Sequence, residues 1–303
     1  MGEIMNNVRS MLGINKIHDA GIKGKGITIA ILDTGIIAHR DLKGRIVNFN
    51  DVIGNRKEIY DDNGHGTHIA GICAGNGEAS RGKYKGICPE AQILAVKVLD
   101  DKGRGKEEDV VKAAEWIIDN KVNFGINIVN ISFGTIECEN KDEITPMIVA
   151  VEKMWDSGLI VVAAAGNNGP EEGSITSPGI SKKIITVGAL DDYRKVNING
   201  KYVNNYSGVG FSKDKEIKPE VIAPATMIRS CGINKGTVSY TEKSGTSMAA
   251  PIVSGCIGLL LNKYPGVRNQ DIKIMLKSTC KDRGMPHNRQ GYGLIDPVNL
   301  LKL

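Results

Sequence analysis

The stretch Ile27-Thr28-Ile29-Ala30-Ile31-Leu32-Asp33-Thr34-Gly35 begins as a short apolar run and ends in a carboxylate and a glycine. The run is continuous rather than alternating, which is typical of a strand covered on both faces of a parallel sheet. Similar runs recur at residues 93–98, 126–131, 159–164 and 184–187. Segments with helical periodicity lie between or after them, at residues 107–120, 143–157, 247–263 and 269–278. This alternation predicts an α/β fold with three layers: a mostly parallel central sheet with helices on both faces.

The chain of 303 residues is 41% hydrophobic and only 5% aromatic, and it contains 37 glycines. It has no internal repeat and no Pro-rich or Ser-rich linker, so we expect residues 1–303 to form a single domain. Residues 1–13 are expected to be a short N-terminal extension, either an inhibitory segment or a surface helix or arm. Residues 195–204 alternate around Asn199-Gly200, which predicts a surface β-hairpin.

The charge pattern argues against nucleic-acid and membrane partners. The formal net charge is +5, and basic residues are interleaved with acidic ones rather than clustered. Apolar runs such as residues 159–165 fall far short of the ~20 residues that a membrane span needs. The sequence carries no pattern that sets an oligomeric state.

Six cysteines show neither paired spacing nor the density of a disulfide scaffold. Free thiols in a reducing compartment are therefore expected. Residues 1–12 lack the apolar segment of a secretory signal. Together these features favour a cytoplasmic location over secretion.

Four motifs carry residues that could do chemistry. Asp33 ends the first strand, at the sheet edge where α/β proteins place their sites. His65 stands between glycines in Asn63-Gly64-His65-Gly66-Thr67-His68, at the start of a predicted helix. His65 and His68 could share a helical face as metal ligands, but no Glu follows in the H-E-x-x-H pattern. A packed structural role fits His68 better.

The other two motifs supply a hydroxyl and an amide. Ser247 stands in Gly245-Thr246-Ser247-Met248-Ala249-Ala250-Pro251, at a helix N-terminus whose free N–H groups favour a nearby oxyanion. Asn167 follows the strand at 159–164 and could donate its N–H to a developing negative charge. Taken singly, the Asp and Asn could simply make turns and the Ser could be an N-cap.

Together, in the order Asp, His, Asn, Ser, the four motifs resemble those of the subtilisin-like serine proteases over nearly the whole chain from about Ile14. The resemblance implies a serine endopeptidase that hydrolyses proteins through an acyl-enzyme. Asp33, His65 and Ser247 would form its catalytic triad, and Asn167 would belong to its oxyanion hole. The short N-terminus and the cysteines make the chain look more like intracellular bacterial members than secreted ones.

The resemblance also implies how a polypeptide substrate binds, with an extended peptide added as a strand between two segments. A preference for medium-sized or apolar side chains is expected of the primary specificity pocket. The implied substrate-binding residues are Gly103, Arg104, Gly105, Ser132, Phe133, Gly134, Ala165, Gly166 and Thr176.

No cofactor is required by this chemistry, but secreted members carry calcium in the loop after the histidine helix. Asp41 matches one ligand of that site and is a candidate calcium ligand. The partner ligands in residues 76–85 are not recognisable, and Lys83 and Lys85 disfavour a cation there.

Two other function classes stay open at this point. A protease-shaped binding or regulatory module would arise if a triad residue were lost, but all of the motif residues are present. A metal-dependent hydrolase would lose activity with a chelator and would tolerate Ser247→Ala.

Overall fold

The computed structural model describes residues 5–135, 145–198, 200–211 and 218–303. Its centre is a seven-stranded sheet in the order β2-β3-β1-β4-β5-β6-β9, in which every neighbouring pair is parallel. The predicted parallel sheet is therefore confirmed. Its strands are β1 (Thr28–Asp33), β2 (Ile46–Asp51), β3 (Gln92–Lys97), β4 (Ile126–Ile131), β5 (Ile160–Ala164), β6 (Ile185–Ala189) and β9 (Val221–Ala223).

Two strands of this sheet were not predicted from the sequence. β2 is an edge strand that stays half-buried over most of its length and contains two asparagines and an aspartate, so it lacks the apolar run of a central strand. β9 is fully buried but only three residues long. The two strands lie at opposite edges of the sheet, where the apolar pattern that indicates a buried strand is weakest.

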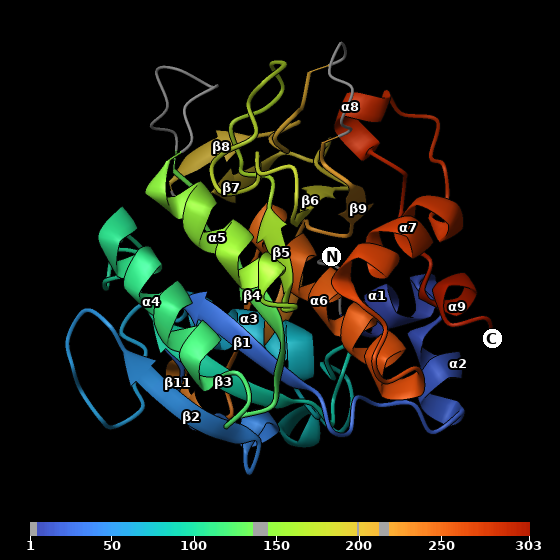
Figure 1. Ribbon diagram of the computed structural model, residues 1–303. Coiled ribbons are helices and arrows are strands. Elements are labelled where there is room, and N and C mark those ends of the chain that lie inside the picture. Colours follow the sequence, from blue (N-terminus) through green and yellow to red (C-terminus); the bar gives the residue numbers. More distant parts are fainter. Residues whose placement is uncertain (1–4, 136–144, 199, 212–217) are drawn as a thin grey trace.

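The helices form a layer on each face of the sheet (Figure 1). The chain goes from β1 to the edge strand β2, returns through α3 to β3, and then passes β1 through α4 to reach β4. Helices α4 and α5 pack against each other in front of the sheet in Figure 1, and α3 lies behind it. The long helix α6 packs against α3. These four helices are α3 (His65–Ala74), α4 (Glu107–Asn120), α5 (Pro146–Asp156) and α6 (Thr246–Lys263).

The predicted helices agree closely with the observed ones. The range predicted for α4 is the observed range, and α6 begins one residue earlier than predicted. For α5, the Thr145 hydroxyl accepts a hydrogen bond from the Ile148 N–H and caps the helix, while predicted residues 143–144 lie outside the described residues. The other helices are α1 (Met5–Met11), α2 (Ile14–Asp19), α7 (Asn269–Thr279), α8 (His287–Gln290) and α9 (Pro297–Leu300), with single 3₁₀ turns η1 (Arg40–Leu42) and η2 (Glu78–Ser80).

Short antiparallel strands lie outside the central sheet. β7 (Val196–Ile198) pairs with β8 (Lys201–Val203) in the segment where the hairpin was predicted, although residue 199 lies outside the described residues. β10 (Ile228–Cys231) pairs with β12 (Tyr240–Lys243), and β11 (Asn234–Thr237) lies between them in the sequence. The β10–β12 ribbon was not predicted, because polar residues interrupt it.

The described part of the N-terminal segment packs its apolar face into the molecule and leaves its other face exposed. Met5 and Val8 of α1 are completely buried, and so are Ile14 and Ile17 of α2. Of the alternatives expected for residues 1–13, the described part forms a helix with one buried and one exposed face, and the inhibitory role stays a prediction. The apolar spacing of these residues matches one face of a helix.

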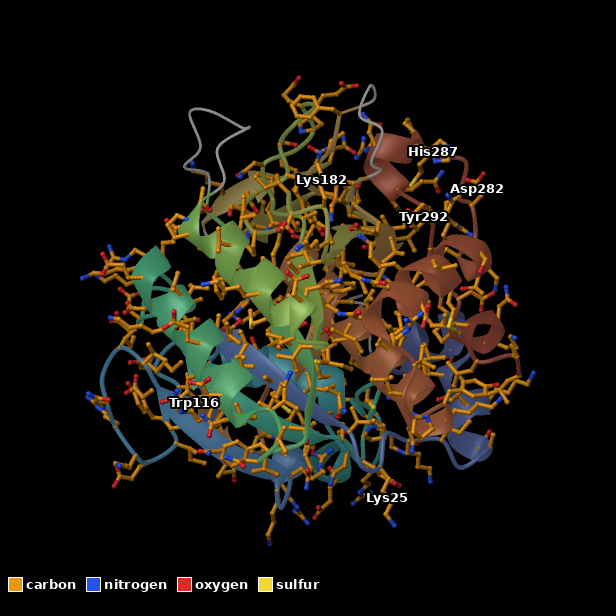
Figure 2. The ribbon with its side chains drawn as sticks, in the orientation of Figure 1. Lys25, Trp116, Lys182, Asp282, His287 and Tyr292 are labelled. Atoms are coloured by element: carbon orange, nitrogen blue, oxygen red, sulfur yellow. The ribbon has the colours of Figure 1, made fainter. Side chains whose placement is uncertain are left out.

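Charged side chains of both signs are spread around the periphery, with Lys25, Lys182 and Asp282 in separate regions (Figure 2). None of the helices in the described part of the chain combines the length and the apolar character that crossing a bilayer requires.

Candidate active site

Asp33 and His65 meet at the carboxyl end of β1. This strand has β3 on one side and β4 on the other, so the order in which strands are added to the sheet reverses here. Open α/β sheets form their sites at such a point. His65 Nδ1 lies 2.8 Å from Asp33 Oδ1 and 2.9 Å from Oδ2. The Asp33 side chain is 1% exposed and that of His65 is 21% exposed. A neutral imidazole that donates its Nδ1–H to the carboxylate carries its lone pair on Nε2.

The first turn of α3 fits tightly against the end of β1. A Cβ atom at Gly66 would lie 2.2 Å from the Gly35 carbonyl oxygen, so only glycine permits this approach. The Gly66 N–H donates to Thr34 Oγ1 over 2.9 Å, and the Thr34 N–H donates to Asp33 Oδ1 over 2.8 Å. The glycine after His65 and the threonine after Asp33 thus fix the two elements relative to each other.

A second carboxylate, Asp61, ties the same elements together and was missed in the sequence. Its Oδ1 accepts hydrogen bonds from the Thr34 hydroxyl and from the backbone N–H groups of Asn63 and Gly64. Its Oδ2 accepts from the N–H and the hydroxyl of Thr67. Burial alone would raise the pKa of Asp61, but these hydrogen bonds outweigh burial and hold the pKa below its usual value.

Lys97 supports the edge from the adjacent strand β3, where it is in register with Asp33. Its side chain is 1% exposed, and its Nζ donates to the carbonyls of Thr34 and Leu99 and to Asp62 Oδ1. A buried lysine is stable only when its donors are satisfied in this way.

Ser247 lies in the first turn of α6, two residues after the N-cap Gly245. Four residues later, Pro251 has no N–H to donate to the Ser247 carbonyl, as an ordinary helix residue would. The Ser132 hydroxyl donates to this carbonyl instead, over 3.0 Å. The first turn of the helix is thereby attached to the end of β4.

The attachment continues into the core through a buried chain of hydrogen bonds. Asn130 Nδ2 donates to Ser132 Oγ over 2.8 Å, and Asn130 Oδ1 accepts from the Ser254 hydroxyl over 2.9 Å. All three side chains are buried. Ser132, predicted as a substrate-binding residue, thus also holds Ser247, and Asn130 and Ser254 were not identified in the sequence.

Asn167 is joined to the same helix start. Its Oδ1 accepts hydrogen bonds from the Thr246 N–H over 2.9 Å and from the Thr246 hydroxyl over 3.1 Å. The Gly166 N–H donates back to Thr246 Oγ1 over 3.1 Å. With Oδ1 occupied, Nδ2 is the donor end of the amide.

Thr176 brings together the predicted pocket residues. Its N–H donates to the Ala165 carbonyl over 3.0 Å. Cβ atoms built at Gly134 and Gly166 would lie 2.2 and 2.5 Å from Thr176 Oγ1, so its side chain fills the space between these two glycines. The Thr176 hydroxyl is buried and has no hydrogen-bond partner among the described residues. Phe133 is half-buried and packs against the core.

The other predicted substrate segment, Gly103-Arg104-Gly105, lies on an exposed turn after β3. Arg104 is held by Asp100, whose carboxylate accepts from the Arg104 backbone N–H and side chain. Asn63 Nδ2 donates to the Asp101 carbonyl over 2.9 Å, which attaches this turn to the loop before His65.

His68 and Asp41 lie apart from this group. The His68 ring is fully buried, and its Nε2 lies 3.2 Å from the carbonyls of Ile228 and Thr241. Burial lowers the pKa of His68 to about 3, so the ring is neutral, as expected of a packed structural histidine. Asp41 is buried in η1.

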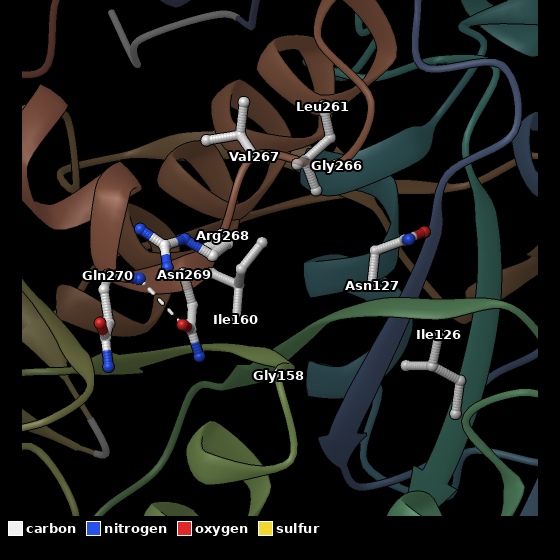
Figure 3. A pocket seen from close by; sticks show the side chains of 10 residues that line it. All are labelled: Ile126, Asn127, Gly158, Ile160, Leu261, Gly266, Val267, Arg268, Asn269 and Gln270. Carbon is white, nitrogen blue, oxygen red and sulfur yellow. Dashed lines mark hydrogen bonds between the residues drawn. The ribbon is translucent and has the colours of Figure 1, made fainter.

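A cavity of about 430 Å³ lies at the opposite edge of the sheet (Figure 3). Ile126 and Asn127 of β4 and Ile160 of β5 line it near the amino ends of these strands, together with Asn269 at the start of α7. None of the predicted catalytic or substrate-binding residues lines this cavity.

Comparison with known proteins identifies the class. Residues 24–293 match the model of the Subtilase family, and the chain therefore belongs to this family and is a subtilisin-like serine endopeptidase. It is 38% identical to serine protease AprX of Bacillus subtilis (strain 168), over 92% of this chain and 66% of AprX. It is 32% identical to subtilisin DY of Bacillus licheniformis, over 90% of each.

Solved structures confirm the subtilisin-like fold. Sphericase superimposes with a TM-score of 0.73 at 31% identity, covering 93% of this chain and 96% of that one. The S41 psychrophilic protease gives a TM-score of 0.76 at 29% identity with the same coverage.

Proposed function

We propose that the chain hydrolyses peptide bonds through Asp33, His65 and Ser247, and the Asp33–His65 contact is the observation that carries this proposal. His65 Nε2 would take the proton from the Ser247 hydroxyl as Oγ attacks the scissile carbonyl carbon. The buried Asp33 carboxylate keeps the ring in the required tautomer and stabilises the imidazolium that forms. His65 then gives this proton to the leaving amine, and an acyl-enzyme remains on Ser247.

Water completes the cycle by the same route. His65 takes a proton from the water, the resulting hydroxyl attacks the acyl carbon, and the proton returns to Ser247 as the acid product leaves. Asp33 does not change its protonation state. All atoms of substrate and water are thus recovered in the two products.

The oxyanion would be stabilised by the Nδ2 donor of Asn167 and the backbone N–H of Ser247. Two features support this assignment. Asn167 Oδ1 is committed to Thr246, so the amide presents its donor end. The Ser247 N–H belongs to the first turn of α6, where N–H groups have no helical acceptor and the helix dipole is positive.

The substrate would be an extended polypeptide bound between residues 103–105 and 132–134 by backbone hydrogen bonds. Thr176 supports a narrow primary pocket, because its side chain fills the space between Gly134 and Gly166. We therefore propose a preference for small to medium-sized side chains before the scissile bond, since a large ring would collide with Thr176.

A reducing compartment is proposed as the place of action. Cys73, Cys88, Cys231 and Cys256 are unpaired and buried, and Cys280 is unpaired and half-buried. Burial raises the pKa of these thiols and keeps them protonated. Cell fractionation with an antibody to the chain tests the proposal: recovery in the culture medium alone would reject it.

Triad kinetics test the catalytic proposal. Ser247→Ala, His65→Ala and the double variant should each reduce kcat on a peptide anilide by about 10⁶, because residues that act as a unit are not additive. If kcat of the double variant fell by the product of the two single-variant factors, the two side chains would act independently. Chelator treatment should leave the triad-dependent rate in place, whereas a metal-dependent hydrolase would lose it.

A further inference from the structure

The loop between α3 and β3, residues 75–91, lies where the family resemblance implies a calcium site. Calcium takes six to eight oxygen ligands from carboxylates, carbonyls and water. The oxygens that this chain could offer are the Asp41 carboxylate and the carbonyls around the loop. Whether they fit calcium depends on what already faces them.

Asp41 faces hydrogen-bond donors. Its carboxylate is completely buried, with Oδ1 accepting from the Ala79 N–H over 2.8 Å and Oδ2 accepting from the Tyr240 hydroxyl over 2.8 Å. Its backbone carbonyl accepts from the Asn76 N–H over 3.0 Å and from the Arg45 guanidinium. A calcium ion bound here would have to compete with these donors at each of the three Asp41 oxygens.

Two arginines take the loop carbonyls. The Arg9 guanidinium, brought in by α1, donates to the carbonyls of Gly82 and Lys85. The Arg45 guanidinium donates to the carbonyls of Ala74 and Pro89 as well as to that of Asp41. Arg9 is only 5% exposed, so its charge depends on these acceptors.

The side chains of Asn6 and Asn15 hold the Arg9 head group in position. Asn6 Oδ1 accepts from its Nη2 over 3.1 Å, and Asn15 Oδ1 accepts from its Nε over 3.2 Å. These acceptors belong to α1 and α2, so the N-terminal segment itself fixes the orientation of the guanidinium that binds the loop. The N-terminal helices thus carry a preorganised cation.

A softer metal would meet the same obstacle. His39, Asp41 and Cys231 converge, with one potential ligand atom from each lying within 4.8 Å of the others. The Asp41 N–H donates to His39 Nδ1, and Cys231 Sγ lies 3.3 Å from that nitrogen. His39 Nε2 lies 2.9 Å from the Ser239 carbonyl and donates to it. Both ring nitrogens of His39 and both carboxylate oxygens of Asp41 therefore already make hydrogen bonds that a metal would have to displace.

We propose that Arg9 and Arg45 hold this loop in place of a calcium ion. Their two guanidinium groups bind the carbonyl oxygens of the loop, as one divalent ion does in calcium-binding relatives. The segment carrying Arg9 is then a structural part of the enzyme, whose removal would release the loop. An inhibitory role is not needed to explain the presence of this N-terminal segment.

Thermal unfolding tests the proposal, with Ser247→Ala as background so that autolysis does not interfere. The full chain should unfold at the same temperature in EDTA and in millimolar calcium, within about 1 °C. Arg9→Met should lower the midpoint by roughly 4–8 °C in both media, because two or more charge-assisted hydrogen bonds are lost. Arg40→Met is the matched control: Arg40 pairs with Glu78 of the same loop but is largely exposed, and the expected shift is below about 2 °C.

Asp41→Asn separates a calcium site in this loop from calcium bound elsewhere. If calcium raises the midpoint of the full chain by more than about 5 °C and Asp41→Asn abolishes that rise, the loop holds calcium and the proposal is overturned. A rise that Asp41→Asn retains places calcium elsewhere and supports the proposal. Equal midpoints for Arg9→Met and Arg40→Met would also overturn it.

Discussion

Replacing Asp61 by Asn should weaken both the fold and the catalytic geometry. The carboxylate accepts five hydrogen bonds, and the amide keeps one acceptor oxygen but turns an NH₂ group toward the N–H and hydroxyl of Thr67. Each hydrogen bond to a charged group is worth about 1.5–3 kcal/mol. Losing the two bonds from Thr67 should therefore cost about 3–6 kcal/mol of unfolding free energy, or roughly 5–9 °C in midpoint.

The catalytic effect follows from what Asp61 holds. It fixes Thr34, next to Asp33, and the loop and first turn that present His65. A displacement of His65 by part of an ångström weakens proton transfer, so kcat/KM should fall by about 10-fold to 100-fold. Asp61 does not contact the reacting atoms, so KM should change little.

The pH dependence of the Asp61 contribution has a defined sign. The pKa of Asp61 is lowered in the folded state, so the carboxylate stabilises the fold fully above the unfolded pKa of about 3.9. This contribution is lost as pH falls below that value, through the folded pKa. Asp61→Asn should therefore have a smaller loss of stability in acid than the parent chain.

The assay compares Asp61→Asn with Glu58→Gln, a carboxylate-to-amide change at an exposed position in the same loop. Urea unfolding in the Ser247→Ala background measures stability, and hydrolysis of a peptide anilide by the active chain measures kcat/KM. Equal stability and equal kcat/KM for the two variants would refute this role of Asp61.

Three further outcomes are expected. Asn167→Ala should lower kcat by about 10²–10³ with little change in KM, a magnitude established on subtilisin itself, whereas the exposed neighbour variant Asn168→Ala should act normally in the same assay. Thr176→Gly should raise kcat/KM for Phe relative to Ala before the scissile bond by about 10-fold; an unchanged ratio in a peptide library would place the pocket elsewhere. Folding stability should fall as pH decreases from about 6.5 toward 3, because the buried His68 stays neutral while the unfolded chain takes up a proton, by up to ~1.4 kcal/mol per pH unit. Urea unfolding at pH 7 and pH 5 should show a smaller decrease for His68→Gln than for the parent.

Much of the fold was predictable because buried strands and amphipathic helices leave a periodic signal. The run ending at Asp33 and the helix at 107–120 are both found as predicted. β2 escaped prediction because its outer position lets it carry Asn48 and Asn50. The burial of one face of α1 was not predicted, because this apolar face, Met5 and Val8, is too short to stand out without its packing partners.

The residues for which we propose direct chemical roles also carry a clearer sequence signal than those that hold them. His65 and Ser247 stand in glycine-rich motifs whose spacing is unusual. Asp61, Ser132 and Asn130 act through contacts between segments far apart in the sequence, which only the folded chain brings together. Pro251 offered a signal, since a proline four residues after Ser247 requires another donor for the Ser247 carbonyl.

The most direct test of the catalytic account is to map where a fluorophosphonate probe becomes attached. The probe should modify Ser247 alone, His65→Ala should slow this modification strongly, and Ser247→Ala should neither react nor digest casein. Modification of another residue, or unchanged casein digestion by Ser247→Ala, would contradict it.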